Sequence, residues 1–183
     1  MISGPTAVGK GTVVVRLTQR HPEIWVSVSA TTRAARPGEV DGVTYHFVTD
    51  ERFDELVAQG LMLEWACVHG MARYGTPREP VEAALAAGRT VILEIDLQGA
   101  RQVIAAMPDA HTVFLAPPSW EELVHRLVGR GTETPEQQRL RLETAKRELA
   151  AAAEFDHVIV NGELEPCVDN LVSLLGLSSS TKG

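Results

Sequence analysis

The chain begins with the pattern that most limits how it can fold, Gly4-Pro-Thr-Ala-Val-Gly9-Lys10, immediately before a helical repeat of apolar residues. Glycines in such a G-x-x-x-x-G-K loop let the backbone wind tightly, so that its N–H groups point at phosphate oxygens. The lysine reaches the β and γ phosphates, and the helix N-terminus adds its dipole. This chain's composition gives the pattern by chance about 0.02 times. We therefore predict a nucleotide phosphate site rather than a plain glycine-rich turn.

The residues assigned to ATP in this loop are Gly4, Pro5, Thr6, Ala7, Val8, Gly9, Lys10, Gly11 and Thr12. Gly11 stands where such loops usually have the Ser or Thr that binds Mg²⁺. We therefore expect the metal to be held by phosphates, water and a carboxylate elsewhere. Only three residues precede Gly4, so the first strand is either very short or part of a longer chain.

Apolar runs alternate with segments of helical period along most of the chain. This alternation predicts a mainly parallel sheet with helices on both faces. Two capping boxes, at 119–122 and 134–137, mark helix starts. The expected strands are 25–29, 61–68, 90–95, 111–116 and 157–160. The expected helices are 12–20, 53–59, 80–87, 97–107, 119–129, 135–153 and 163–175.

Residues 27–77 interrupt this alternation, because their strand-like pieces lack full crossover helices. We expect a substrate-binding insert there, in a single domain of 183 residues. The expected core is 1–26, 78–125 and 143–177, the expected mobile lid is 126–142, and 178–183 is expected to be a frayed tail.

Composition excludes several classes of protein. The net charge of −7 argues against a nucleic-acid partner, which needs a basic footprint. No apolar run approaches the ~18 residues of a membrane span. Cys67 and Cys167 lie far apart without a metal-ligand pattern, which favours two buried free thiols in a reducing compartment. We expect a soluble cytoplasmic protein, whose oligomeric state the sequence leaves undetermined.

Fourteen of the 17 basic residues are arginines, and residues 1–36 hold five bases against one acid. Arg33 and Arg36 lie three apart in a hydroxyl-rich loop, which suits a second anion site, although loop arginines are more often solvated surface charges. Asp96 follows an apolar run, at the strand end where α/β proteins bind ligands. Helix capping is the competing role for Asp96. Glu94 points the same way along the strand.

Several motifs together resemble the guanylate kinase family. They are Ser29-x-Thr-Thr-Arg33-x-x-Arg36-x-Gly-Glu39, Asp41-Gly, Tyr45-x-Phe47, Glu64-Trp, Tyr74-Gly-Thr76, Glu94-Ile-Asp96-Leu-Gln-Gly99, Pro117-Pro-Ser119 and Arg126-x-x-x-Arg130-Gly-Thr-Glu133. The resemblance extends from Ile2 to about Leu175. It implies a three-layer P-loop kinase fold with a mainly parallel five-stranded central sheet, a GMP-binding insert and a short lid.

The resemblance also implies the roles of individual residues. Glu64 and Thr76 would bind guanine, because a carboxylate accepts from its N1–H and N2–H₂ donors and adenine lacks this donor pair. Thr76 replaces the serine expected there and keeps its hydroxyl. The residues implied to bind GMP are Ser29, Arg33, Arg36, Tyr45, Glu64, Tyr74, Thr76, Glu94 and Asp96.

By the same resemblance, Lys10, Arg126, Arg130 and Arg141 would stabilise the transferring phosphoryl group, and Asn161 would lie near the ATP adenine. Asp96 would hold Mg²⁺ through water. The implied reaction is ATP + GMP giving ADP + GDP, with dGMP also accepted. A peptide-binding module of the same fold and a kinase of other base specificity are the alternatives. The intact phosphate loop argues against the first, and Glu64 with Thr76 argues against the second.

Overall fold

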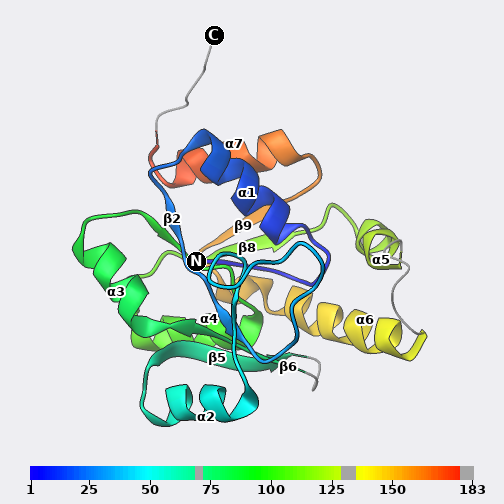
Figure 1. The fold of residues 1–183 in the computed structure, drawn as a ribbon. Helices are drawn as coiled ribbons and strands as arrows, with labels where there is room; N and C mark the ends of the chain where they lie inside the picture. The colour runs from blue at the N-terminus through cyan, green and yellow to red at the C-terminus, as the bar shows by residue number, and fades with distance from the viewer. Residues whose placement is uncertain (69–71, 129–134, 178–183) are drawn as a thin grey trace. The chain divides into compact units, whose positions relative to one another are not determined.

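A computed structural model describes residues 1–68, 72–128 and 135–177 of the chain (Figure 1). Contacts within the chain divide it into two compact units. Unit 1 comprises Met1–Ile24 and His111–Gly183, and unit 2 comprises Trp25–Ala110. Each unit is described by itself.

Unit 1 is built on a parallel sheet in the order β1-β8-β9. The strands are β1 (Ile2–Ser3), β8 (Val113–Ala116) and β9 (His157–Val160). The first strand pairs Ile2 with Val113 and Ser3 with Phe114, and both of its residues are buried. The strand before the glycine loop therefore consists of Ile2 and Ser3 in this structure.

The helices of unit 1 are α1 (Lys10–Arg20), α5 (Trp120–Val128), α6 (Pro135–Ala150) and α7 (Leu164–Leu174), with a 3₁₀ turn at Ala152–Glu154. Helices α1 and α7 lie side by side (Figure 1) and bury apolar faces that include Leu17 and Leu171. Because α1 is packed in this way, the start of the helix that follows the glycine loop is fixed.

Unit 2 contains two sheets. Strands β2 (Trp25–Val26) and β7 (Val91–Ile92) pair in parallel. The second sheet has the order β4-β3-β6-β5, from β3 (Ala30–Thr31), β4 (His46–Phe47), β5 (Met62–Val68) and β6 (Ala72–Pro77). The helices are α2 (Asp50–Ala58), α3 (Arg78–Ala86) and α4 (Leu97–Ala106).

A small apolar core supports the second sheet of unit 2. Ala30, Phe53 and Met62 are buried there, with Val48 and Leu56 packed against them. Strand β5 is at the edge of this sheet, and α4 lies against it. Because α4 packs against β5, residues of these two elements contact each other.

The predicted alternation of strands and helices is confirmed. The described part of the chain has five strands in parallel sheets, three in the sheet β1-β8-β9 of unit 1 and two in the pair β2-β7 of unit 2. The region of the predicted insert holds β3, β4 and β6, which periodicity alone did not identify. The contact division assigns residues 78–110 to the same unit as the predicted insert. Residues 129–134 of the predicted lid and the predicted tail lie outside the described residues.

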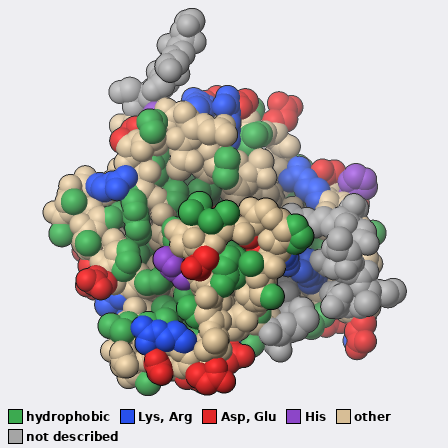
Figure 2. Space-filling view, viewed as in Figure 1, with side chains coloured by type: hydrophobic (Ala, Val, Ile, Leu, Met, Phe, Trp, Pro, Cys, Tyr) green, Lys and Arg blue, Asp and Glu red, His purple; other side chains and the backbone are tan. Residues whose placement is uncertain are grey.

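None of the described helices is long and apolar enough to cross a membrane. On the face shown in Figure 2, the described Lys and Arg side chains are interspersed with acidic and apolar groups and form no continuous basic stripe.

Candidate active site

The glycine loop connects β1 to α1, and its path depends on two positions without a side chain. Gly4 has φ 148°, and a Cβ there would lie 2.3 Å from the carbonyl oxygen of Leu115 in β8. Gly9 has φ 99°, and a Cβ there would lie 2.8 Å from Nδ2 of Asn161. Both the conformation and the close approach exclude larger residues, so the loop is held tightly against the ends of two parallel strands.

Lys10, the first residue of α1, folds back over the loop. Its Nζ donates to the carbonyl oxygens of Gly4, at 2.6 Å, and Pro5, at 3.3 Å. The N-cap residue Gly9 supplies no side-chain cap, and the first turn of α1 contains no acid. The uncapped N–H groups and the ammonium group therefore both suit an anion. Gly11 and Thr12 are exposed.

Two residues far along the chain form hydrogen bonds to the backbone of the loop. Asn161, which follows β9 and is buried, donates from Nδ2 to the carbonyl oxygen of Val8 at 2.8 Å. Arg126 of α5 donates to Val8 O at 3.3 Å and to Asn161 O at 3.2 Å. Arg126 also pairs with Glu122 at 2.8 Å, one turn earlier. The amide of Asn161 thus contacts the loop backbone, and its predicted place near adenine stays a prediction.

The remaining predicted lid residues are described only in part. Arg130 lies outside the described residues. Arg141 is half-buried on α6, while Arg139 on the same helix is exposed and pairs with Glu143. Their predicted roles at the transferring phosphoryl group stay predictions.

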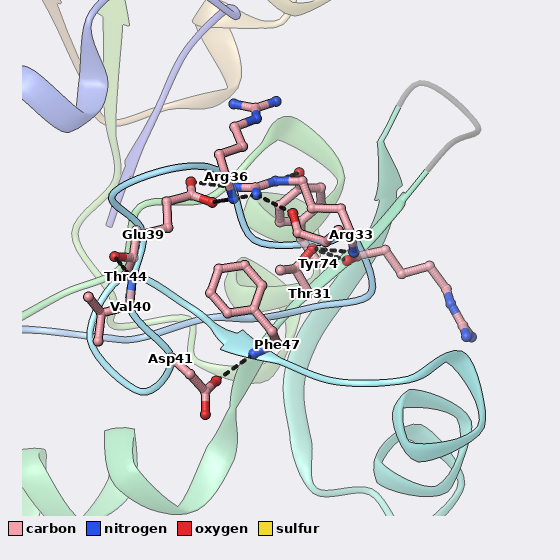
Figure 3. A network of polar contacts seen from close by, with 11 residues as sticks. Thr31, Arg33, Arg36, Glu39, Val40, Asp41, Thr44, Phe47 and Tyr74 are labelled. Atoms are coloured by element: carbon pink, nitrogen blue, oxygen red, sulfur yellow. Dashed lines mark hydrogen bonds and ion pairs between the residues drawn. The ribbon is translucent and has the colours of Figure 1, made fainter.

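In unit 2, Arg33 is the centre of a polar network in the loop after β3 (Figure 3). Its Nε donates to the hydroxyl of Tyr74 at 3.0 Å, and its two terminal nitrogens donate to Glu39 at 2.6 and 2.7 Å. A further bond reaches Ala34 O at 2.9 Å. These bonds use four of the five N–H groups of the guanidinium, which fixes its plane.

Glu39 is the residue that orients this loop. Besides Arg33, it accepts a bond from the backbone N–H of Arg36 at 2.7 Å. Hydrogen bonds from Arg33 and from this N–H lower the pKa of Glu39 to about 2. The carboxylate is therefore ionised throughout the physiological range.

Two of the other predicted phosphate ligands, Tyr45 and Tyr74, lie beside the same guanidinium. The rings of Tyr45 and Tyr74 meet edge to face at 5.8 Å, and the Arg33 guanidinium lies 5.0 Å from the centre of the Tyr45 ring. Burial raises the pKa of Tyr45, with a further contribution from the charge of Glu94. Arg36 is exposed, and its side chain extends away from the network (Figure 3). The backbone oxygen of Ser29 accepts from His46 N at 2.9 Å.

The two predicted base-binding residues face one another across β5 and β6. Glu64 is 4% exposed, Thr76 is fully buried, and the Thr76 hydroxyl donates to Glu64 Oε1 at 2.6 Å. Burial raises the pKa of Glu64 to about 7, the Thr76 bond opposes that shift, and the charge of Asp96 adds to it. This carboxylate has paid a desolvation cost that a ligand with N–H donors would offset.

Asp96 is the N-cap of α4, because its Oδ1 accepts from the backbone N–H of Gly99 at 2.8 Å. The capping role weighed from the sequence is therefore present. Capping engages one carboxylate oxygen of Asp96, so it does not exclude a role of this residue toward Mg²⁺. Glu94 is half-buried two residues earlier.

The described residues contain no group of three or more His, Cys, Asp or Glu side chains arranged to hold a metal. Magnesium prefers oxygen ligands and keeps several waters when it binds nucleotide phosphates. A phosphate loop without a hydroxyl at Gly11 fits a metal held mainly by phosphates and water.

Sequence reasoning assigned no role to Glu39, Gly99 or Gln102. Glu39 and Gly99 lie inside the motifs that carry the family resemblance, so these motifs could have indicated that the two residues belong to the site. Gln102, on α4, bonds the backbone of Trp65 through its amide. Only a tertiary contact reveals that pairing.

A tight glycine loop with an inward lysine, at the end of a parallel strand and the start of a helix, defines a P-loop phosphotransferase fold. A shikimate kinase from Bacteroides thetaiotaomicron shares this fold, with a TM-score of 0.53 and 17% identity over 96% of both chains.

The guanylate kinase family model matches residues 1–177, and the chain belongs to the guanylate kinase family. It is 65% identical to the guanylate kinase of Cutibacterium acnes, with 97% of this chain and 89% of that protein aligned. It is 61% identical to the guanylate kinase of Thermobifida fusca, with coverage of 98% and 91%. The crystal structure of guanylate kinase from Anaplasma phagocytophilum superimposes with a TM-score of 0.78 at 35% identity, covering 96% and 82% of the two chains. The predicted family and fold class are thereby confirmed.

Proposed function

We propose that this chain transfers the γ-phosphoryl group of ATP to GMP, giving ADP and GDP. Its family membership supports the reaction class, since guanylate kinases are ATP:GMP phosphotransferases. The observation that carries the base specificity is the buried pair of Glu64 and Thr76.

Glu64 selects guanine by hydrogen-bond complementarity. Its ionised carboxylate accepts from N1–H and N2–H₂ of guanine, whereas adenine presents an acceptor at N1 and no 2-amino group. A mismatched base would leave a buried carboxylate unpaired, and sites of this kind reject the wrong partner by about 10⁴-fold. The Thr76 hydroxyl, already donating to Oε1, holds the carboxylate in the orientation that the base requires.

Arg33, Arg36, Tyr45 and Tyr74 bind the phosphate of GMP. The guanidinium of Arg33 is fixed by Glu39 and Tyr74, so its charge is in place before the nucleotide arrives. Arg36 is the exposed cation of this loop and is able to turn toward a dianion. Because a nucleotide phosphate is already an anionic nucleophile, no general base is needed.

The phosphate loop binds ATP, and Lys10 neutralises charge on the transferring group. Its present bonds to Gly4 O and Pro5 O keep the ammonium group at the loop until phosphate oxygens replace those carbonyls. Arg126, Arg130 and Arg141 supply further positive charge, and Asn161 acts by supporting Val8. In-line transfer requires closure around both nucleotides, which excludes water that would hydrolyse ATP.

Mg²⁺ would be held by the ATP phosphates and water, with Asp96 accepting from a metal-bound water. The ion supplies charge neutralisation and alignment of the phosphates. We also expect the protein to act in the cytoplasm, where ATP and reduced thiols occur together. Both cysteines are free; the expectation that they are buried is confirmed for Cys167 and wrong for Cys67, which is exposed.

A coupled assay of ADP release, offering GMP, dGMP, AMP, UMP and CMP at equal concentrations, tests the proposal. GMP and dGMP are expected to be the fastest substrates, because none of the assigned residues contacts the ribose 2′-OH. Fastest turnover with any other base would refute the assignment of Glu64.

A further inference from the structure

Glu64 lies against the first turn of α4 at a distance that only glycine allows. A Cβ at position 99 would lie 2.2 Å from Glu64 Oε2 and 2.9 Å from its Cδ. Gly99 is helical and does not have a positive φ, so its backbone conformation suits any residue. The requirement for glycine therefore comes from the space that the carboxylate occupies.

The backbone that carries this contact is itself fixed. Asp96 caps α4 by accepting from Gly99 N–H, and a Cβ at Gly99 would also lie 3.4 Å from that Asp96 oxygen. Glu64 is thus confined between the Thr76 hydroxyl on β6 and the Cα of Gly99 on α4. The charge of Asp96 contributes to the raised pKa of Glu64, so the two carboxylates interact unfavourably.

One turn further along α4, Gln102 fixes the backbone of the strand that holds Glu64. Its Oε1 accepts from Trp65 N–H at 3.1 Å, and its Nε2 donates to Trp65 O at 2.6 Å. Strand β5 is an edge strand, so these two groups have no neighbouring strand on that side. The amide of Gln102 takes the place of a strand and ties β5 to α4 beside Glu64.

We propose that Gly99 and Gln102 are positioning residues for base recognition, which set where the Glu64 carboxylate lies without touching the nucleotide. The inference rests on the proposed function, because it assigns these residues to the guanine contact of Glu64. It requires that they control the affinity for guanine more than the rate of phosphoryl transfer.

The test measures dissociation constants for GMP and IMP by calorimetry without ATP, together with kcat and the KM values of both substrates. IMP keeps N1–H and lacks the 2-amino group, so the ratio of the two constants reports how well Glu64 meets both donors. Gly99→Ala is expected to weaken GMP binding by about 30-fold and to reduce the preference for GMP over IMP, since an added methyl displaces the carboxylate. Its kcat at saturating GMP and its KM for ATP stay within about threefold of wild type.

Gln102→Met keeps the size of the side chain and removes both bonds to Trp65. It is expected to weaken GMP binding by about five- to tenfold, with the same loss of preference over IMP. Gln59→Met makes the same chemical change at the exposed C-cap of α2 and is expected to leave all constants unchanged. A melting curve for each variant checks the fold. If Gly99→Ala does not fold, the GMP and IMP dissociation constants of Gln102→Met test the inference.

A double variant separates positioning from general damage. If Gly99 acts through Glu64, adding Gly99→Ala to Glu64→Gln should weaken GMP binding by less than about twofold further. Unchanged GMP affinity and unchanged GMP:IMP preference in folded Gly99→Ala and Gln102→Met would overturn the inference, as would full additivity in the double variant. A wild-type protein without a preference for GMP would instead refute the proposed function.

Discussion

The phosphate loop of unit 1 and the candidate monophosphate site of unit 2 both suit anions, but they are made from different parts of the chain. The loop uses consecutive backbone atoms, and its geometry depends on Gly4 and Gly9 fitting against β8 and Asn161. The monophosphate site uses side chains from positions about forty residues apart, such as Arg33 and Tyr74, joined by hydrogen bonds.

This difference determines how each site can fail. The backbone N–H groups of the loop remain when its side chains are changed. Lys10 is the one charged side chain of the loop, so its substitution is the direct way to test the role of the loop in phosphoryl transfer. In the proposed function, the second site separates its tasks, with the phosphate contacts at Arg33 and the base contacts at Glu64. Its two glutamates also differ, because Glu39 is paired with a cation and Glu64 is buried beside another carboxylate.

Lys10→Ala is expected to have the largest effect of the variants considered. We expect kcat to fall by about 10³-fold, because the charge on the transferring group loses its nearest cation. GMP affinity, measured by calorimetry, should stay within about twofold of wild type, since the loop does not bind GMP in this scheme.

Lys146→Ala is the matched control for Lys10. Lys146 is exposed on α6, with its ammonium over the Trp120 ring at 5.3 Å, and it has no proposed catalytic role. Turnover by Lys10→Ala close to that of Lys146→Ala would remove Lys10 from the mechanism.

Glu64→Gln tests the base-binding half of the second site. An amide cannot accept from both guanine donors, so kcat/KM for GMP should fall by about 10²-fold while kcat/KM for AMP does not fall. Parallel assays of the two nucleotides give the ratio. Glu55→Gln, at an exposed ion pair on α2, should leave the ratio unchanged. A GMP:AMP ratio retained in Glu64→Gln would mean that another group selects the base.

Arg33→Lys tests the phosphate-binding half. A lysine cannot reproduce the fork that Glu39 and Tyr74 hold in place, so KM for GMP should rise by about tenfold. The GMP:AMP ratio should not change, because both nucleotides carry the same phosphate. Arg52→Lys, in the exposed pair with Glu55, provides the control. A changed base preference in Arg33→Lys would contradict the separation of the two tasks.

The same contrast explains how much the sequence could predict. The loop was predictable from its own residues, because consecutive backbone geometry has a local pattern, and hydrophobic periodicity predicted the helices and most strands. The second site was predictable only through a family resemblance, since folding pairs Arg33 with Tyr74 and Glu64 with Thr76. Strand β6 includes Gly75 and ends at Pro77, which weakens the alternating pattern of a strand.

Tertiary contacts also changed the interpretation of single residues. Asn161 was predicted to lie near adenine, which stays a prediction, and the structure adds a hydrogen bond from its buried amide to the carbonyl of Val8. Gln102 occupies an ordinary polar position on an amphipathic helix, and no local pattern distinguishes an exposed amide from one that completes an edge strand. The roles of such residues depend on which element packs against them.

The two glutamates should respond to pH in opposite directions, and these effects are on stability and not on turnover. The raised pKa of Glu64, about 7 against a reference of 4.5, means that its ionised form costs stability above pH 7 and costs little below pH 4.5. The lowered pKa of Glu39, about 2, means that its pairing stabilises the fold above pH 4.5 and is lost as the pH falls toward 2. Glu64→Gln should therefore raise the thermal midpoint at pH 8, because it increases the free energy of unfolding by at most about 3 kcal/mol. At pH 5 the midpoint should rise much less. Glu39→Gln should lower the midpoint at both pH values. Thermal unfolding of the ligand-free variants beside Glu55→Gln measures both effects, and a lower midpoint for Glu64→Gln at pH 8 would show that its carboxylate is not strained by burial.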